Sequence, residues 1–120
     1  MAVEFALILP IFLTLVFGVV EFGVLLTNKI SLTNAARVGA RHASLSGGNT
    51  TTSQTKATAA ASGLTSCSNL NAVTSYTLIA PIEATTVVSC TYSPITPLGS
   101  LINSLMPTAL SATTKMVVEA

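Results

Sequence analysis

Residues 2–26 read AVEFALILPIFLTLVFGVVEFGVLL, and this stretch decides the fold because it is long and apolar enough to cross a bilayer as a helix. About 20 apolar residues span the hydrocarbon core, and no charge occurs between Phe5 and Val20. A cleavable signal peptide would have a shorter apolar core followed by a small-residue cleavage site. Here the run continues into a second helical pattern, so we expect a transmembrane or filament-core segment at residues 3–26.

Residues 27–46 continue this helix in amphipathic form. The small residues Ala35, Gly39 and Ala43 recur every four positions and therefore share one helix face. Small residues allow another backbone to approach closely. Two interpretations are open: the row packs beneath its own domain, or it contacts a neighbouring subunit.

Paired glycines, Gly47 and Gly48, are expected to end this helix. A helix over residues 1–46 would be about 65 Å long at about 1.5 Å per residue. Pro10 lies inside it, and a proline is tolerated in lipid or in a helical bundle when neighbouring groups satisfy the freed carbonyl.

Residues 47–120 are predicted to form a small α+β head after the long helix. A Thr- and Ala-rich stretch indicates a short helix at 52–62. Alternating patterns predict strands in SYTLIA (75–80), TTVVSCTY (85–92) and SATTKMVVEA (111–120), with a turn at Pro81 between the first two. We expect a three- to four-stranded antiparallel sheet. Apolar positions at helical spacing predict a short amphipathic helix that covers it: Leu98, Leu101, Ile102 and Leu105.

The composition argues against several functional classes. Half of the residues are hydrophobic, 8% are charged and the net charge is +1, so the basic surface that nucleic acid requires is missing. The sequence has one histidine, no aspartate, no GxSxG and no GxxxxGK, so we expect neither catalysis nor a cofactor.

The two cysteines, Cys67 and Cys90, are too few for a zinc site, which needs about four ligands. We therefore expect no metal. In an exported chain two cysteines most simply form one disulfide, and two buried free thiols are the alternative.

Several short motifs in the first 43 residues carry a family resemblance. They are Val3-Glu4-Phe5-Ala6-Leu7, Pro10, Gly18-x-x-Glu21-Phe22-Gly23 and Ala35-Ala36-Arg37-x-Gly39-Ala40-Arg41. With the predicted architecture, this segment resembles the TadE-like proteins of tight-adherence (Flp-type) pilus systems. The likeness is specific over residues 2–43 and looser over 44–120.

The resemblance implies a structural, non-enzymatic pilin or pseudopilin. Such a subunit is cut by a prepilin peptidase, held in the bacterial inner membrane by its apolar helix, and then handled by the pilus assembly machinery. It would polymerise through this helix into an extracellular helical filament for surface attachment. The alternative is a minor pseudopilin that assists assembly or secretion without being the main fibre subunit. In the wider pilin class the mature chain has glutamate at its fifth position, whereas Glu4 is fourth here.

Two glutamates inside the apolar stretch require an explanation, because a charge in lipid is costly. Glu4 would neutralise the α-amine at Met1 of a neighbouring subunit in a water-excluding bundle, or it would lie at headgroup level. Glu21 would pair with Lys29, Arg37 or Arg41 of a staggered neighbour, or reach water at the far membrane edge. The residues expected to act in assembly are Met1, Glu4, Phe5, Pro10, Gly18, Glu21, Ala35, Gly39 and Ala43.

The two indicators of membrane orientation disagree. The basic residues after the apolar run favour a cytoplasmic head by the positive-inside tendency, whereas a disulfide requires the head outside. We give priority to the disulfide, because basic residues upstream of the apolar run normally set orientation.

Overall fold

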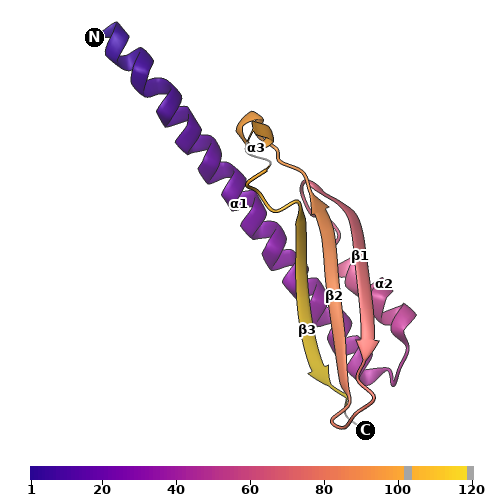
Figure 1. Ribbon diagram of the computed structural model, residues 1–120. Helices are drawn as coiled ribbons and strands as arrows, with labels where there is room; N and C mark the ends of the chain where they lie inside the picture. The colour runs from indigo at the N-terminus through magenta and orange to yellow at the C-terminus, as the bar shows by residue number, and fades with distance from the viewer. Residues whose placement is uncertain (102–103, 119–120) are drawn as a thin grey trace.

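The computed structural model describes residues 1–101 and 104–118. Its helices are α1 (Ala2–Leu45), α2 (Thr50–Ala60) and α3 (Pro97–Leu101), and its strands are β1 (Cys67–Tyr76), β2 (Glu83–Tyr92) and β3 (Ala109–Val117). We call α2, α3, the three strands and their connections the head. The molecule measures 72 × 22 × 19 Å, because α1 extends far beyond the head (Figure 1). The predicted α+β class, with a long N-terminal helix and an antiparallel sheet, is confirmed.

The long helix α1 is continuous over 44 residues, including Pro10. Proline removes one backbone donor from a helix, and next to it the Thr14 hydroxyl donates to the Pro10 carbonyl at 2.8 Å. The helix ends where predicted: the Ser46 N–H closes the last turn onto the His42 carbonyl, and Gly47 and Gly48 follow with φ of +58° and +113°. Glycine adopts such angles without steric cost.

The sheet has the strand order β1-β2-β3, and both pairings are antiparallel. One face packs against α1 and α2, while the other faces solvent (Figure 1). Alternate residues of β2 point to the helices, and Val88 at its centre is fully buried together with Leu32 of α1 and Ala57 of α2. This period of two is the pattern that predicted the strand.

The first predicted strand is displaced from its true position. Residues 77–80 connect the strands, and β1 lies before them at Cys67–Tyr76. A β-bulge between Ser68 and Asn71, with Asn69 at φ +52°, interrupts the alternation of β1. The sequence at the start of β1 is polar and does not alternate, so the strand was not predicted there. The apolar Leu78 and Ile79, which suggested a strand, lie exposed in the loop. The prediction at 85–92 is confirmed by β2. The prediction at 111–120 is confirmed by β3 as far as Val117; Val118 lies beyond the strand, and residues 119–120 lie outside the described part.

The two short helices differ in how well they were predicted. The helix expected at 52–62 is α2 at Thr50–Ala60, and the Asn49 side chain caps it by accepting from the Thr52 N–H at 3.1 Å. The prediction of an amphipathic helix that covers the sheet is wrong. The helix α3 has only five residues, and Leu101 and Leu105 are 80% and 84% exposed. Ile102 lies outside the described residues. The sheet needs no third cover, because α1 and α2 already occupy its apolar face.

Candidate functional site: the free helix and the Glu21 cradle

Residues 2–20 of α1 project beyond the head, and we call this part the free helix (Figure 1). In the described part of the chain, α1 is long and apolar enough to cross a membrane: its most apolar 18-residue window has a mean hydropathy of 2.5, and none of that window is buried. Large side chains such as Phe5, Ile8 and Phe12 are mostly exposed. Apolar surface on this scale marks a site that lipid or another protein covers.

The start of the free helix holds a close charge pair within one chain. The Met1 ammonium nitrogen lies 3.8 Å from Glu4 Oε2, and both side chains are exposed. The carboxylate also lies in the first helical turn, where negative charge is favourable. Both Met1 and Glu4 are thus accessible to a neighbour, and pairing between subunits stays a prediction.

The other assembly residues expected here are also accessible. Phe5 and Pro10 are exposed, and no atom lies within 4 Å of where a Cβ on Gly18 would be. Their part in assembly likewise stays a prediction.

Glu21 marks the level at which the head begins, and its side chain is only 1% exposed. Its Oε1 accepts hydrogen bonds from the Tyr92 hydroxyl and, at 3.1 Å, from the Ile95 N–H. Its Oε2 accepts from the Thr96 N–H at 3.0 Å and from the Thr96 hydroxyl at 2.8 Å. We call this arrangement the Glu21 cradle. Four donors satisfy a buried carboxylate without a cation.

A glycine allows the cradle to close. The Gly99 N–H donates to Thr96 Oγ1 at 3.1 Å, which orients that hydroxyl. A Cβ at Gly99 would lie 2.5 Å from Pro94 Cβ and 3.2 Å from Glu21 Cδ. Any side chain at this position would therefore push the loop away from the carboxylate.

Tyr92 contributes the donor that comes from the sheet. Burial of its phenol raises the pKa of Tyr92, and the hydrogen bond to the neighbouring Glu21 carboxylate raises it further. The phenol therefore stays protonated and keeps donating at any physiological pH.

These contacts differ from both predicted interpretations of Glu21. The sequence suggested a basic partner on another subunit or contact with water, whereas the structure gives partners 71 to 75 residues away in the same chain. Only the position of Glu21 in an apolar stretch was a usable signal. Nothing local to the stretch around Tyr92 and Thr96 indicated that they are its partners.

Three further polar contacts hold the head along α1. Asn28 is 2% exposed, and its Nδ2 donates to the Thr65 carbonyl at 2.6 Å. Lys29 Nζ donates to the Ser111 carbonyl, and the Tyr76 hydroxyl donates to the Ala43 carbonyl at 3.1 Å. Sequence reasoning missed these contacts, although Asn28 follows Glu21 by seven residues, about two helical turns, and so lies on the same side of α1.

The small-residue row packs inside the chain. Ala35 and Ala43 are fully buried, and a Cβ at Gly39 would lie 2.7 Å from Thr86 Cγ2 and 2.9 Å from Ala57 Cβ. The helix thus uses these residues to bring α2 and β2 close to its backbone. The row thus packs beneath the chain's own domain, as the first interpretation expected. A subunit contact at Ala35, Gly39 and Ala43 stays a prediction.

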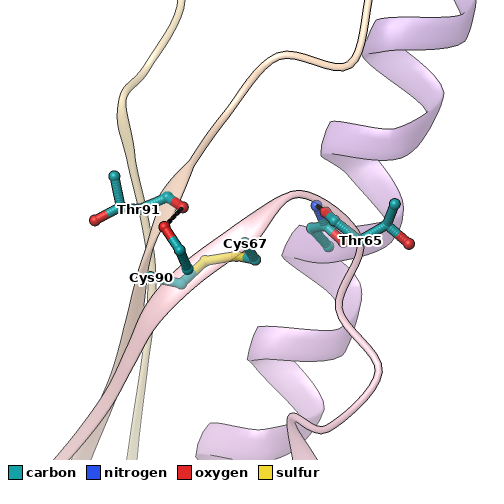
Figure 2. Close-up of a disulfide and its surroundings, with 6 residues drawn as sticks. Thr65, Cys67, Cys90 and Thr91 are labelled. Carbon is teal, nitrogen blue, oxygen red and sulfur yellow. Dashed lines mark hydrogen bonds between the residues drawn. A yellow bond between two sulfur atoms is a disulfide. The ribbon is translucent and has the colours of Figure 1, made fainter.

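Cys67 and Cys90 form a disulfide, with their Cα atoms 5.6 Å apart. It joins the first residue of β1 to β2 beside the β-bulge, where Ser68 Oγ donates to the Thr91 carbonyl at 3.4 Å (Figure 2). Figure 2 also shows Thr65, the acceptor for Asn28, beside α1. The cross-link therefore stabilises the strand end that carries Tyr92 toward the cradle.

Within residues 1–101 and 104–118, no group of three or more His, Cys, Asp and Glu side chains is placed to hold a metal ion. The single histidine, His42, contacts Ser53 Oγ through Nδ1 at 3.3 Å.

Comparison with known proteins gives one positive result. A family model described as TadE-like protein matches residues 1–41, which confirms the predicted resemblance over the free helix and most of the remaining length of α1. Comparisons with curated proteins and with solved structures gave no significant match. The match and the apolar helix fit a protein associated with the tight-adherence pilus and anchored in a membrane.

Proposed function

We propose that this chain is a pilin-like structural subunit of a tight-adherence pilus system. The observation that carries the proposal is the free helix: an apolar segment with no buried residue, within the stretch that matches the TadE-like family. Such a surface must be covered by lipid before assembly and by other helices afterwards. The proposed division is an anchor and filament segment followed by a head at residues 47–120.

The span itself is proposed to be residues 2–20, shorter than the expected 3–26. Those 19 residues extend about 28 Å as a helix, close to the hydrocarbon thickness of about 30 Å. From Glu21 onward the head covers one side of α1, and Val24 and Leu25 already pack against the core. The sequence prediction extended further because those residues are equally apolar.

The head is proposed to lie outside the inner membrane. The Cys67–Cys90 disulfide supports this orientation, because disulfides persist in oxidising compartments. Labelling of intact cells with a membrane-impermeant thiol reagent, with and without an impermeant reductant, tests it. Labelling that requires reductant supports the proposal, whereas labelling only after lysis contradicts it.

We further propose that a prepilin peptidase and the pilus assembly machinery process the chain, which then forms homopolymers. Glu4 would pair with the Met1 ammonium of a neighbouring copy once the helices bundle. The test is Glu4→Gln, assayed by the yield of sheared filaments in negative stain and by mass spectrometry of their main band. Glu83→Gln, a half-buried carboxylate on the head, is the matched control. Normal filament yield from Glu4→Gln would contradict the pairing.

A minor pseudopilin that assists assembly is the second candidate. One observation favours it: the small-residue row is buried against α2 and β2 of the same chain. Close helix contact between copies would then be limited mainly to the free helix. Abundance separates the two functions. Sheared filaments made mainly of this chain support the main-subunit proposal, and trace amounts support the accessory role.

A further inference from the structure

The end of the head nearest the free helix carries exposed apolar side chains. This end is formed by α3 and its flanking segments, beside the point where α1 leaves the head (Figure 1). Leu101 and Leu105 are 80% and 84% exposed, and Ile95 is about half exposed. On α1 at the same level, Phe22 is also mostly exposed. We call these four residues the collar.

Charge is absent around the collar. Residues 84–114 contain no charged side chain, and this range includes α3 and both of its connections. The carboxylate of Glu21, the one charge at this level of α1, is enclosed by the cradle. A charged group is costly at the edge of the hydrocarbon, and this end of the head exposes none within the described residues.

The length of the free helix places the collar relative to a bilayer. If residues 2–20 fill the hydrocarbon core, Glu21 and the collar lie directly at its boundary, without an intervening linker. This step rests on the proposed membrane anchoring. Because the cradle binds the residues before α3 to Glu21, the height of the collar is set by the same helix that spans the membrane.

We propose that the collar is a lipid-contacting surface, which seats the head in the membrane interface through Leu101 and Leu105. Exposed apolar side chains at this depth are favourable because they leave water for the boundary of the acyl chains. The lipid contact is continuous with that of the free helix. The equally exposed Leu78 does not share it, because the β1–β2 loop lies at the opposite end of the head (Figure 1).

The chain contains no tryptophan, so a single introduced tryptophan reports its own environment. Three full-length variants form the test: Leu101→Trp in the collar, Leu78→Trp as the matched exposed control, and Phe12→Trp inside the free helix. Each is reconstituted at a low protein-to-lipid ratio into phosphatidylcholine–phosphatidylglycerol vesicles. Tryptophan emission is then compared between vesicles with ordinary and with acyl-brominated lipids, because bromine quenches on contact.

The expected result is strong quenching of Phe12→Trp, partial quenching and a blue shift for Leu101→Trp, and no quenching of Leu78→Trp. If Phe12→Trp is quenched but Leu101→Trp behaves like Leu78→Trp, the collar proposal is overturned while membrane anchoring stands. If Phe12→Trp is also unquenched, the anchoring fails and the collar proposal fails with it. A blue shift of Leu101→Trp without quenching at the same low protein-to-lipid ratio would assign the collar to a contact with protein and overturn the lipid contact.

Discussion

Replacement of Glu21 by glutamine tests whether the cradle holds the head to the long helix. The carboxylate is the acceptor in all four of its hydrogen bonds. The donors are the Tyr92 hydroxyl, the Ile95 N–H, and the N–H and hydroxyl of Thr96. Glutamine keeps the shape but replaces one acceptor oxygen by an NH₂ group, which then faces donors. Hydrogen bonds to a charged group contribute about 1.5–3 kcal/mol each, and a buried donor left unpaired costs about 1–3 kcal/mol.

We therefore expect Glu21→Gln to lower the free energy of unfolding by about 2–4 kcal/mol, with rotation of the Thr96 hydroxyl recovering part of the loss. For a urea dependence of about 2 kcal/mol per molar, the unfolding midpoint in mild detergent falls by roughly 1–2 M. Hydrogen exchange should accelerate first at the Ile95 and Thr96 amides, because the loop before α3 loses its anchor on α1.

Glu83→Gln serves as the control, because it makes the same chemical change at a half-buried carboxylate. Its unfolding midpoint should remain near that of the wild type. An unchanged midpoint for Glu21→Gln, with protected amides at Ile95 and Thr96, would refute the view that these hydrogen bonds hold the loop on the helix.

Three further predictions follow from the packing of the head. Because the pKa of Tyr92 is raised in the folded state, the unfolded chain releases this proton first as pH rises; stability should be level below about pH 10 and fall above it, and Tyr92→Phe should flatten that fall in thermal melts recorded against pH. Gly39→Ala should cost about 1–3 kcal/mol through overpacking against α2 and β2. Gly23→Ala, with no atom within 4 Å of the added Cβ, should be neutral or stabilising by up to about 1 kcal/mol, so equal denaturation midpoints for these two variants would contradict the packing argument. Finally, replacing both Cys67 and Cys90 by serine removes a cross-link between residues 23 apart in sequence and should lower the free energy of unfolding by about 3 kcal/mol. The measurement compares urea unfolding of the double variant with that of the oxidised chain. Equal unfolding midpoints would show that the disulfide is dispensable for the head.

The sequence alone was sufficient for the existence of the free helix, but not for the residue at which it ends, and for two of the strands. A run of apolar residues without charge predicts an exposed membrane or filament segment, because its stability as a helix does not depend on which residues elsewhere contact it. In β2 and β3 a period of two places Val88 and Ala112 toward the helices, and burial on one face makes that pattern legible. Periodicity depends only on neighbouring residues, so it can be recognised from the sequence alone.

Tertiary structure alone decided the contacts of Glu21 and of the small-residue row within the chain, and the position of β1. The partners of Glu21 lie more than 70 residues away, and no spacing within either segment encodes that contact. The sequence around Gly39 is compatible with a close approach of either α2 or a second subunit. Only the positions of Ala57 and Thr86 in the folded chain show that α2 and β2 approach it. The physical reason is common to all three: hydrogen bonding and close packing depend on which groups meet after folding, whereas hydropathy depends only on the residues themselves.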